Sequence, residues 1–314
     1  MSSSDQPTAA PAPEVVPVTD GRAPLGAAVA LLASVVGLVS GGVGALLAVV
    51  NLAGYAFGPW TTDHRLGTAL VGAAMLGTAP GLLAAARART WAEARTLVLP
   101  VVVVVPGLLV VTLVNPDAMP LLTGGPIVTV FFALGWIAVL GGLSLWIVLA
   151  VPAQWLRARS LERGGRRSGA PSVAPLPAWS RPALALLGSS WTGIGAGLVF
   201  LPGFWGAFVP WATTRVEAQA LGVWALALGV GVLAALAEDD VRLLRPAGLA
   251  LPGVAAAVGL ALVVRAGEVA WGSGAGLALV AMLIGLAVAG AAGRLLATRH
   301  PAGAPTARPG PGAA

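Results

Sequence analysis

The chain of 314 residues contains no cysteine and no lysine, and only 10% of its residues are charged. Without cysteine there can be no disulfide framework, no thiol nucleophile and no cysteine-ligated metal or haem centre. Without lysine there can be no phosphate-loop lysine and no Schiff base with pyridoxal phosphate or retinal. All 18 basic residues are arginine, which keeps its charge and cannot carry a proton near neutral pH.

Apolar residues and glycine dominate the composition, because 57% of the chain is hydrophobic and a further 43 residues are glycine. A water-soluble domain of this length needs far more charge to cover its surface. Runs of about 20 uncharged apolar residues recur along the chain, and each is long enough to cross a bilayer. The sequence therefore predicts an all-α integral membrane protein with the lipid bilayer as its partner. Its eight transmembrane helices are expected over residues 25–50, 66–86, 96–115, 126–151, 183–202, 218–237, 247–264 and 275–293.

The arginines alternate with these spans. If the N-terminus is cytoplasmic, fifteen arginines fall on the inner side and only Arg65, Arg215 and Arg265 fall outside. This asymmetry is a strong positive-inside signal, so we expect a multi-pass protein of the cell membrane with both termini in the cytoplasm. The net charge of +6 then reflects orientation in the membrane and does not indicate nucleic-acid binding.

Composition also divides the chain into segments. The start lacks the basic residues of a secretory signal peptide, so the first span is expected to be retained. The central segment combines arginine with glycine and proline, which is typical of a flexible cytoplasmic linker. The expected segments are a disordered tail at 1–23, a four-helix unit at 24–152, the Arg-rich linker at 153–182, a second four-helix unit at 183–296 and a disordered tail at 297–314.

The two four-helix units resemble each other in sequence. A shift of 151 residues aligns 42–62 with 193–213 and matches nine of 21 positions, including a Pro-Trp pair in each segment. The same shift brings Pro100 to within one residue of Pro252. Because each unit holds an even number of spans, duplication would leave the two units parallel in the membrane. The alternative is coincidence in a sequence of low complexity.

Glycines at four-residue spacing lie in the first and fifth spans. Small residues on one face let helix backbones approach closely. The expected helix-packing glycines are Gly37, Gly41, Gly44, Gly193 and Gly197. A substrate path beside these glycine-rich helices is the alternative interpretation.

The expected outer loops gather most of the remaining chemistry. The tryptophans of the two Pro-Trp pairs are expected at the level of the lipid headgroups, and an aromatic ligand site is the alternative. If the repeats close around an axis, the charged loop residues would face one another across a vestibule. This candidate outer vestibule consists of Trp60, Asp63, His64, Arg65, Trp211, Arg215 and Glu217. The alternative is that these are ordinary solvated charges, and the inner acidic cluster at 238–240 is likewise expected to be a solvated loop.

No acidic, basic or histidine residue falls at mid-depth in any expected span, which disfavours proton coupling through a buried carboxylate. We find no catalytic motif, metal-ligand spacing or cofactor signature, so we expect no cofactor and no enzyme. The favoured function is binding or transport-like handling of an uncharged or lipid-like small molecule in a central cavity between the two repeats. One alternative is a non-catalytic membrane scaffold, or a subunit that works with a membrane-protein partner or with a second copy of the chain. A third and weaker alternative is an enzyme that uses Asp63, His64 or Glu217.

Overall fold

The computed structural model describes residues 22–165 and 174–299, and the described part is helical throughout apart from short connections. Eight of its helices are long and apolar enough to cross a membrane, so this part of the prediction is confirmed. These long helices are α1 (Ala27–Leu52), α2 (Arg65–Ala86), α3 (Trp91–Val114), α5 (Ile127–Gly165), α6 (Ser180–Phe200), α8 (Arg215–Glu238), α9 (Ala247–Val264) and α10 (Gly274–Arg299). The short elements are η1 (Pro116–Ala118), α4 (Pro120–Thr123), α7 (Pro202–Trp205), η2 (Gly206–Phe208), η3 (Val241–Leu244) and η4 (Ala266–Glu268).

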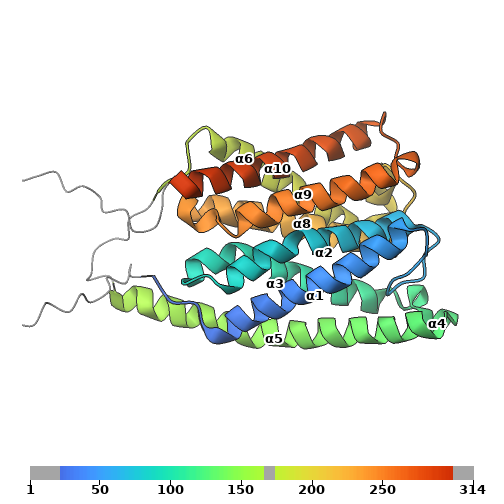
Figure 1. Ribbon diagram of the computed structural model, residues 1–314, viewed down its shortest axis with the longest axis horizontal. Helices are drawn as coiled ribbons and strands as arrows, with labels where there is room; N and C mark the ends of the chain where they lie inside the picture. Colours follow the sequence, from blue (N-terminus) through green and yellow to red (C-terminus); the bar gives the residue numbers. More distant parts are fainter. Residues whose placement is uncertain (1–21, 166–173, 300–314) are drawn as a thin grey trace, which may run out of the picture.

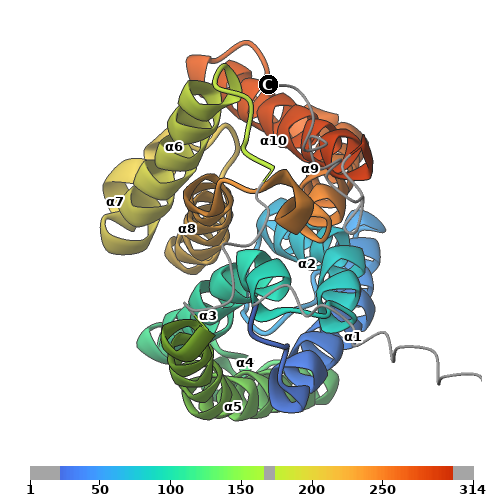
Figure 2. The same ribbon diagram turned by 90° about the vertical axis from the view of Figure 1, so that its left-hand side faces the viewer.

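The long helices run side by side along the molecule and alternate in direction (Figure 1). Residues 22, 165, 174 and 299 lie at one end, which we call the linker end. The opposite end carries the loops after α1, α3, α6 and α9, and we call it the loop end. Viewed along the helices, α2, α3, α8 and α9 form the interior, while α1, α5, α6 and α10 surround them (Figure 2).

Close backbone contacts hold two of the outer helices, α1 and α6, each to an inner helix. A Cβ atom on Gly44 of α1 would lie 2.7 Å from the backbone nitrogen of Leu76 and 2.8 Å from the carbonyl oxygen of Gly72. A Cβ atom on Gly195 of α6 would meet Leu226 and Gly222 of α8 in the same way. Since no side chain fits at these positions, glycine is what lets α1 pack on α2 and α6 pack on α8.

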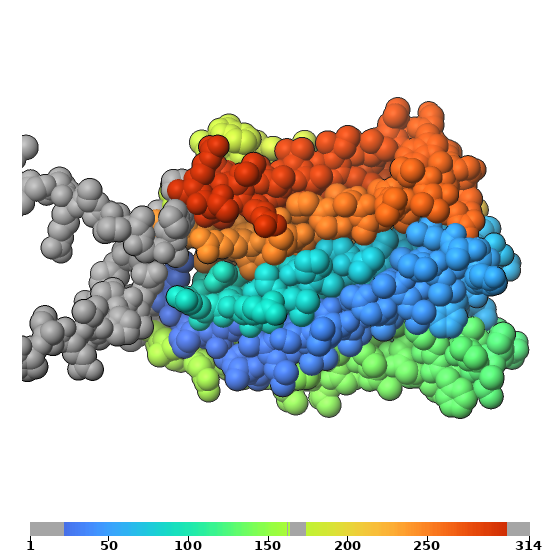
Figure 3. Space-filling model, viewed as in Figure 1, coloured from blue at the N-terminus to red at the C-terminus, as the bar shows by residue number. Residues whose placement is uncertain are grey.

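The first four long helices also interlock with the last four. Gly77 of α2 lies directly against the backbone of Gly253 of α9, and α3 packs on α8 where Gly107 meets Val223. On the face seen in Figure 3, α2 lies next to α9 without a gap. The main apolar core contains buried residues from all eight long helices, so the two groups share it, and each group adds one small cluster of buried residues of its own.

Several residues at the linker end differ from the expected tails and linker. Ala23, expected in the N-terminal tail, is buried and accepts a hydrogen bond from the Trp91 amide (2.9 Å). Residues 153–165, expected in the linker, continue α5, where the Arg159 guanidinium lies 3.4 Å from the centre of the Trp155 ring one turn earlier. Helix α10 likewise continues to Arg299. Residues 174–182, also expected in the linker, lead into α6, which begins at Ser180, and Leu176 among them is buried and donates its amide to the Asp239 carboxylate (3.0 Å). Residues 1–21, 166–173 and 300–314 of the expected tails and linker lie outside the described residues.

Candidate functional site: an apolar cavity between α1 and α5

A cavity of about 380 Å³ lies between α1, α3 and α5. Helices α2, α8 and α9 form its back wall, so both groups of four helices contribute to it. Its lining on α3 runs from Thr96 to Leu108, which corresponds to ~18 Å at about 1.5 Å per residue. The cavity is therefore elongated along the helices and has the volume of a small-molecule site.

Almost no polar group is available inside this cavity. The Thr78 hydroxyl donates to the carbonyl oxygens of Ala74 and Met75, at 3.1 and 2.8 Å, within its own helix. The Thr96 hydroxyl donates to the Glu93 carbonyl oxygen at 3.2 Å. The Ser40 hydroxyl also belongs to the lining, but nearly all of the remaining cavity surface is hydrocarbon, which suits an apolar ligand better than a polar solute.

The cavity opens sideways between α1 and α5. Phe131 and Val139 of α5 line it and are 67% and 41% exposed, so they reach from the cavity to the outer surface. Gly135 lies between them, and a Cβ atom on it would meet no other atom within 4 Å. The two helices come together again at the linker end, where the Gln154 side chain accepts from the Gly26 amide (3.0 Å).

Four aromatic rings close the loop end of the cavity. The ring of Phe132 lies 4.7 Å from that of Phe57, and the ring of Trp136 lies 6.0 Å from that of Trp60 in an edge-to-face contact. Phe132 and Trp136 are on α5, whereas Phe57 and Trp60 are in the loop after α1. The Trp136 indole N–H donates to the Thr112 hydroxyl (3.2 Å), which fixes the orientation of this ring.

The expected position of Trp60 at the lipid headgroups is therefore wrong. Trp60 is only 3% exposed, because Trp136 and the core enclose its ring. Trp211, the other tryptophan of the repeated pair, is half-buried and lines a cavity between α6 and α10. Tryptophan is common both at membrane interfaces and in cores, so its occurrence in the sequence could not distinguish the two.

The residues of the expected outer vestibule occupy the loop end. Asp63, Arg65 and Arg215 are exposed and His64 is half-buried. Glu217 is only 1% exposed, and its carboxylate accepts from the Thr214 amide (2.9 Å) and hydroxyl (3.0 Å) in a capping box at the start of α8.

Glu217 also connects the two helix groups. The Thr62 hydroxyl donates to Glu217 Oε1 at 3.0 Å, and Gly67 of α2 leaves the space that this carboxylate occupies. The start of α8 and the segment before α2 thus meet around a carboxylate that is enclosed and does not face an open mouth. Among the described residues no group of three or more His, Asp or Glu side chains could hold a metal ion.

Two further polar contacts at the loop end were not anticipated. Arg265 at the end of α9 donates to the carbonyl oxygens of Asn51 (2.8 Å) and Leu52 (3.1 Å) at the end of α1. A cation at this position satisfies the last carbonyls of a helix and favours the negative end of its dipole. Asn115 donates to Gln219 (2.7 Å), which donates to the Val199 carbonyl oxygen (3.1 Å).

The acidic cluster 238–240 is not the solvated loop that we expected. Asp240, only 2% exposed, pairs with Arg22 at 2.5 Å. Glu238 pairs with Arg95, and Asp239 pairs with Arg181 at 2.5 Å. The partners lie more than 50 residues away in the sequence, so local charge patterning could not reveal them. We call these three ion pairs the linker-end clasp.

The predicted helix-packing glycines have different surroundings. On α1, Cβ atoms on Gly37 and Gly41 would lie 3.0 Å from Leu83 and 3.6 Å from Ala79, and Gly44 touches backbone. The prediction that Gly193 packs against a helix is wrong, because a Cβ atom there would meet nothing within 4 Å. Gly195 makes the close helix contact instead. Gly197 lies against the indole of Trp205 in the short helix α7, where a Cβ atom would come within 2.6 Å of three ring atoms.

Comparisons of the whole chain with protein-family models, with curated proteins and with solved structures find no match.

Proposed function

We propose that this chain is a multi-pass membrane protein that takes up an uncharged, lipid-like molecule from the bilayer through the opening between α1 and α5. The observation that carries this proposal is the cavity itself, which is elongated, almost wholly apolar and open towards the side. A molecule dissolved among lipid chains would enter from the side and would need no polar recognition inside. The proposal includes binding or transport-like handling and no chemical step.

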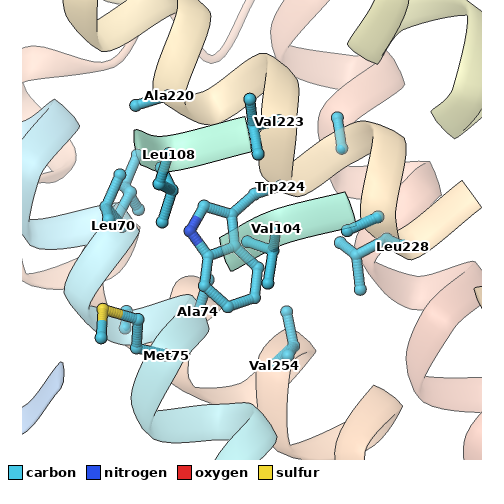
Figure 4. Packing of buried hydrophobic residues seen from close by; sticks show 14 of the residues in the cluster. Leu70, Ala74, Met75, Val104, Leu108, Ala220, Val223, Trp224, Leu228 and Val254 are labelled. Atoms are coloured by element: carbon cyan, nitrogen blue, oxygen red, sulfur yellow. The ribbon is translucent and has the colours of Figure 1, made fainter. Parts of the chain in front are cut away.

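The proposed ligand site lies beside the centre of the molecule and not on it. Trp224 of α8 fills the space between the interior helices, where Leu70, Ala74, Val104 and Leu108 surround its indole (Figure 4). A central cavity was the original expectation, and this packing leads us to place the ligand to one side of Trp224, in the cavity between α1 and α5 that Trp224 also lines. The interlocking of α2 with α9 also opposes a rocking motion of one group against the other, so we assign the movement that admits ligand to α5.

We also propose that the chain consists of two parallel four-helix repeats with the linker end in the cytoplasm. The matched positions 42–62 and 193–213 support the duplication. So do the equivalent backbone contacts of Gly44 and Gly195, which are 151 residues apart. The excess of arginine at the linker end supports the orientation and the cell membrane as location.

A photolabelling experiment tests the proposed site. The full chain in liposomes is irradiated with a diacylglycerol that carries a diazirine in its acyl chain, and the labelled peptides are identified by mass spectrometry. We expect label on α3 and α5. Gly135→Phe places a ring at the opening and should reduce this label several-fold.

Gly142→Phe is the matched control, because Gly142 lies on the same helix, is exposed and is equally open to a new side chain, yet does not line the cavity. Its labelling should equal that of the unaltered chain. Equal labelling of the Gly135→Phe and Gly142→Phe variants, or label spread evenly over the outer helices, would refute the proposed site.

A further inference from the structure

A second apolar groove, of about 410 Å³, lies between α6 and α10 in the half of the molecule nearer the linker end. Val232 of α8 and Ala247 and Gly248 of α9 form its floor. Along α10 its lining runs from Ala281 to Leu296, ~22 Å at about 1.5 Å per residue. The hydrocarbon core of a bilayer is about 30 Å thick, or about 15 Å for each leaflet, so the groove is long enough to hold an acyl chain of one leaflet along its length.

The groove is open to the side and reaches the linker end. Leu186 on α6 and Val288 on α10 line it and are 71% and 60% exposed. Trp179, which precedes α6, lines its end nearest the linker and is 73% exposed. An exposed tryptophan at the end of a spanning helix is typical of the level of lipid headgroups.

Arginines stand next to lining residues at this end of the groove. Ser180, Leu244 and Gly293 line the groove, and each is followed in the sequence by an arginine: Arg181, Arg245 and Arg294. Arg299 is three positions beyond Leu296, the last lining residue on α10. Four arginines from three helices or their ends thus lie one to three positions from a lining residue, although none of them lines the groove itself, and we call these four arginines the rim.

The acidic residues of the second helix group do not neutralise this rim. Glu238 and Asp240 pair with Arg95 and Arg22 of the first group, and only Asp239 pairs with a rim residue, Arg181. Arg245, Arg294 and Arg299 make no ion pair with any residue in the ranges 22–165 and 174–299. The linker-end clasp thus leaves a net positive rim beside an apolar groove.

We propose that the groove between α6 and α10 binds an anionic phospholipid of the leaflet at the linker end. An acyl chain would lie along the groove, and the phosphate would meet the arginines, whose guanidinium groups bind phosphate oxygens in a bidentate manner. A zwitterionic lipid would fill the groove equally well but would gain less from the rim. Free phosphate would use the rim and leave the groove without a role.

Native mass spectrometry of the full chain in mild detergent tests this site with three probes: phosphatidylglycerol, phosphatidylcholine and inorganic phosphate. We expect retained phosphatidylglycerol on the unaltered chain. The double variant Arg294→Gln and Arg299→Gln should weaken its binding roughly 30-fold, given about 1 kcal/mol for each arginine near an anionic lipid surface. Its matched control, Arg87→Gln with Arg89→Gln, removes two exposed arginines from the same end of the other helix group and should leave binding unchanged.

A second pair of variants tests the groove. Ala183 lines it and is exposed, so Ala183→Phe should obstruct the acyl chain and weaken phosphatidylglycerol binding several-fold. Ser189→Phe, at an exposed position of α6 outside the lining, is the control. Equal retention of phosphatidylcholine, an equal effect of inorganic phosphate, or loss of binding in both members of a pair would overturn the proposal. Gly135→Phe should not alter this binding, so failure at this site and failure of the cavity between α1 and α5 can be told apart.

Discussion

The two helix groups use similar aromatic residues in different ways. Phe57 and Phe208 are 151 residues apart, yet Phe57 packs on Phe132 of α5, whereas Phe208 is 56% exposed and contacts Phe204 and Trp205 of its own loop. The sequence of α10 contains no aromatic residue that could receive Phe208. Both loops border a cavity, since Phe208 and Trp211 line the one between α6 and α10. The partner helix therefore decides whether the phenylalanine packs on a ring of the facing helix, as Phe57 does, or stays largely exposed, as Phe208 does.

The interior helices α2 and α8 differ in a complementary way. At positions 150 residues apart, Gly67 stands against Glu217, and Ala74 stands near Trp224 (Figure 4). A bulky side chain on one helix is thus matched by a small one on the other. Under the proposed duplication, two identical copies could not both carry the large residue at the centre, because packed interiors tolerate little extra volume.

The largest effect is expected where the two groups are most alike. Gly44→Leu and Gly195→Leu each drive a side chain into the backbone of the neighbouring helix, so both variants should lose monodisperse protein in size-exclusion chromatography. Gly42→Leu and Gly193→Leu are the controls, because a Cβ atom meets nothing within 4 Å at either position. A normal elution profile for only one of Gly44→Leu and Gly195→Leu would contradict the equivalence of these two helix contacts.

A smaller effect is expected from the complementary centre. Trp224→Ala should reduce the free energy of unfolding by about 3–5 kcal/mol, because it leaves a cavity among buried residues. Ala74→Trp should be harmful in the unaltered chain through overpacking, and clearly less harmful in the Trp224→Ala background, where space has been freed. Thermal unfolding of all four chains in detergent measures this coupling, and additive effects would count against the complementarity.

The smallest effect is expected at the aromatic loops. Phe57→Ala should lower the free energy of unfolding by about 1–3 kcal/mol, since its ring packs on Phe132. Phe208→Ala should change it by less than about 0.5 kcal/mol, as is usual for an exposed side chain. Thermal unfolding midpoints compare the two, and a larger loss for Phe208→Ala would show that the outward loop has a structural partner.

The sequence predicted the eight apolar helices well because the length of each run and the absence of charge are properties of a single segment. The end of α5 was placed too early, since residues 153–165 are polar enough to resemble a linker although Gln154 and Trp155 still support a helix. The cavity, the burial of Trp60 and the linker-end clasp depend on which helices become neighbours. Periodicity within one helix carries no information on that choice, and a shift of two residues separates Gly193 from Gly195.

The interlocking of α2 with α9 has a consequence for biosynthesis. Gly77 is made 176 residues before Gly253, the residue whose backbone it touches. At about 5–20 residues per second, a ribosome needs roughly 10–35 s to cover that distance. During this interval the close-packing surface of α2 is without its final neighbour, so the nascent chain must keep this surface available until nearly all of the protein has been inserted.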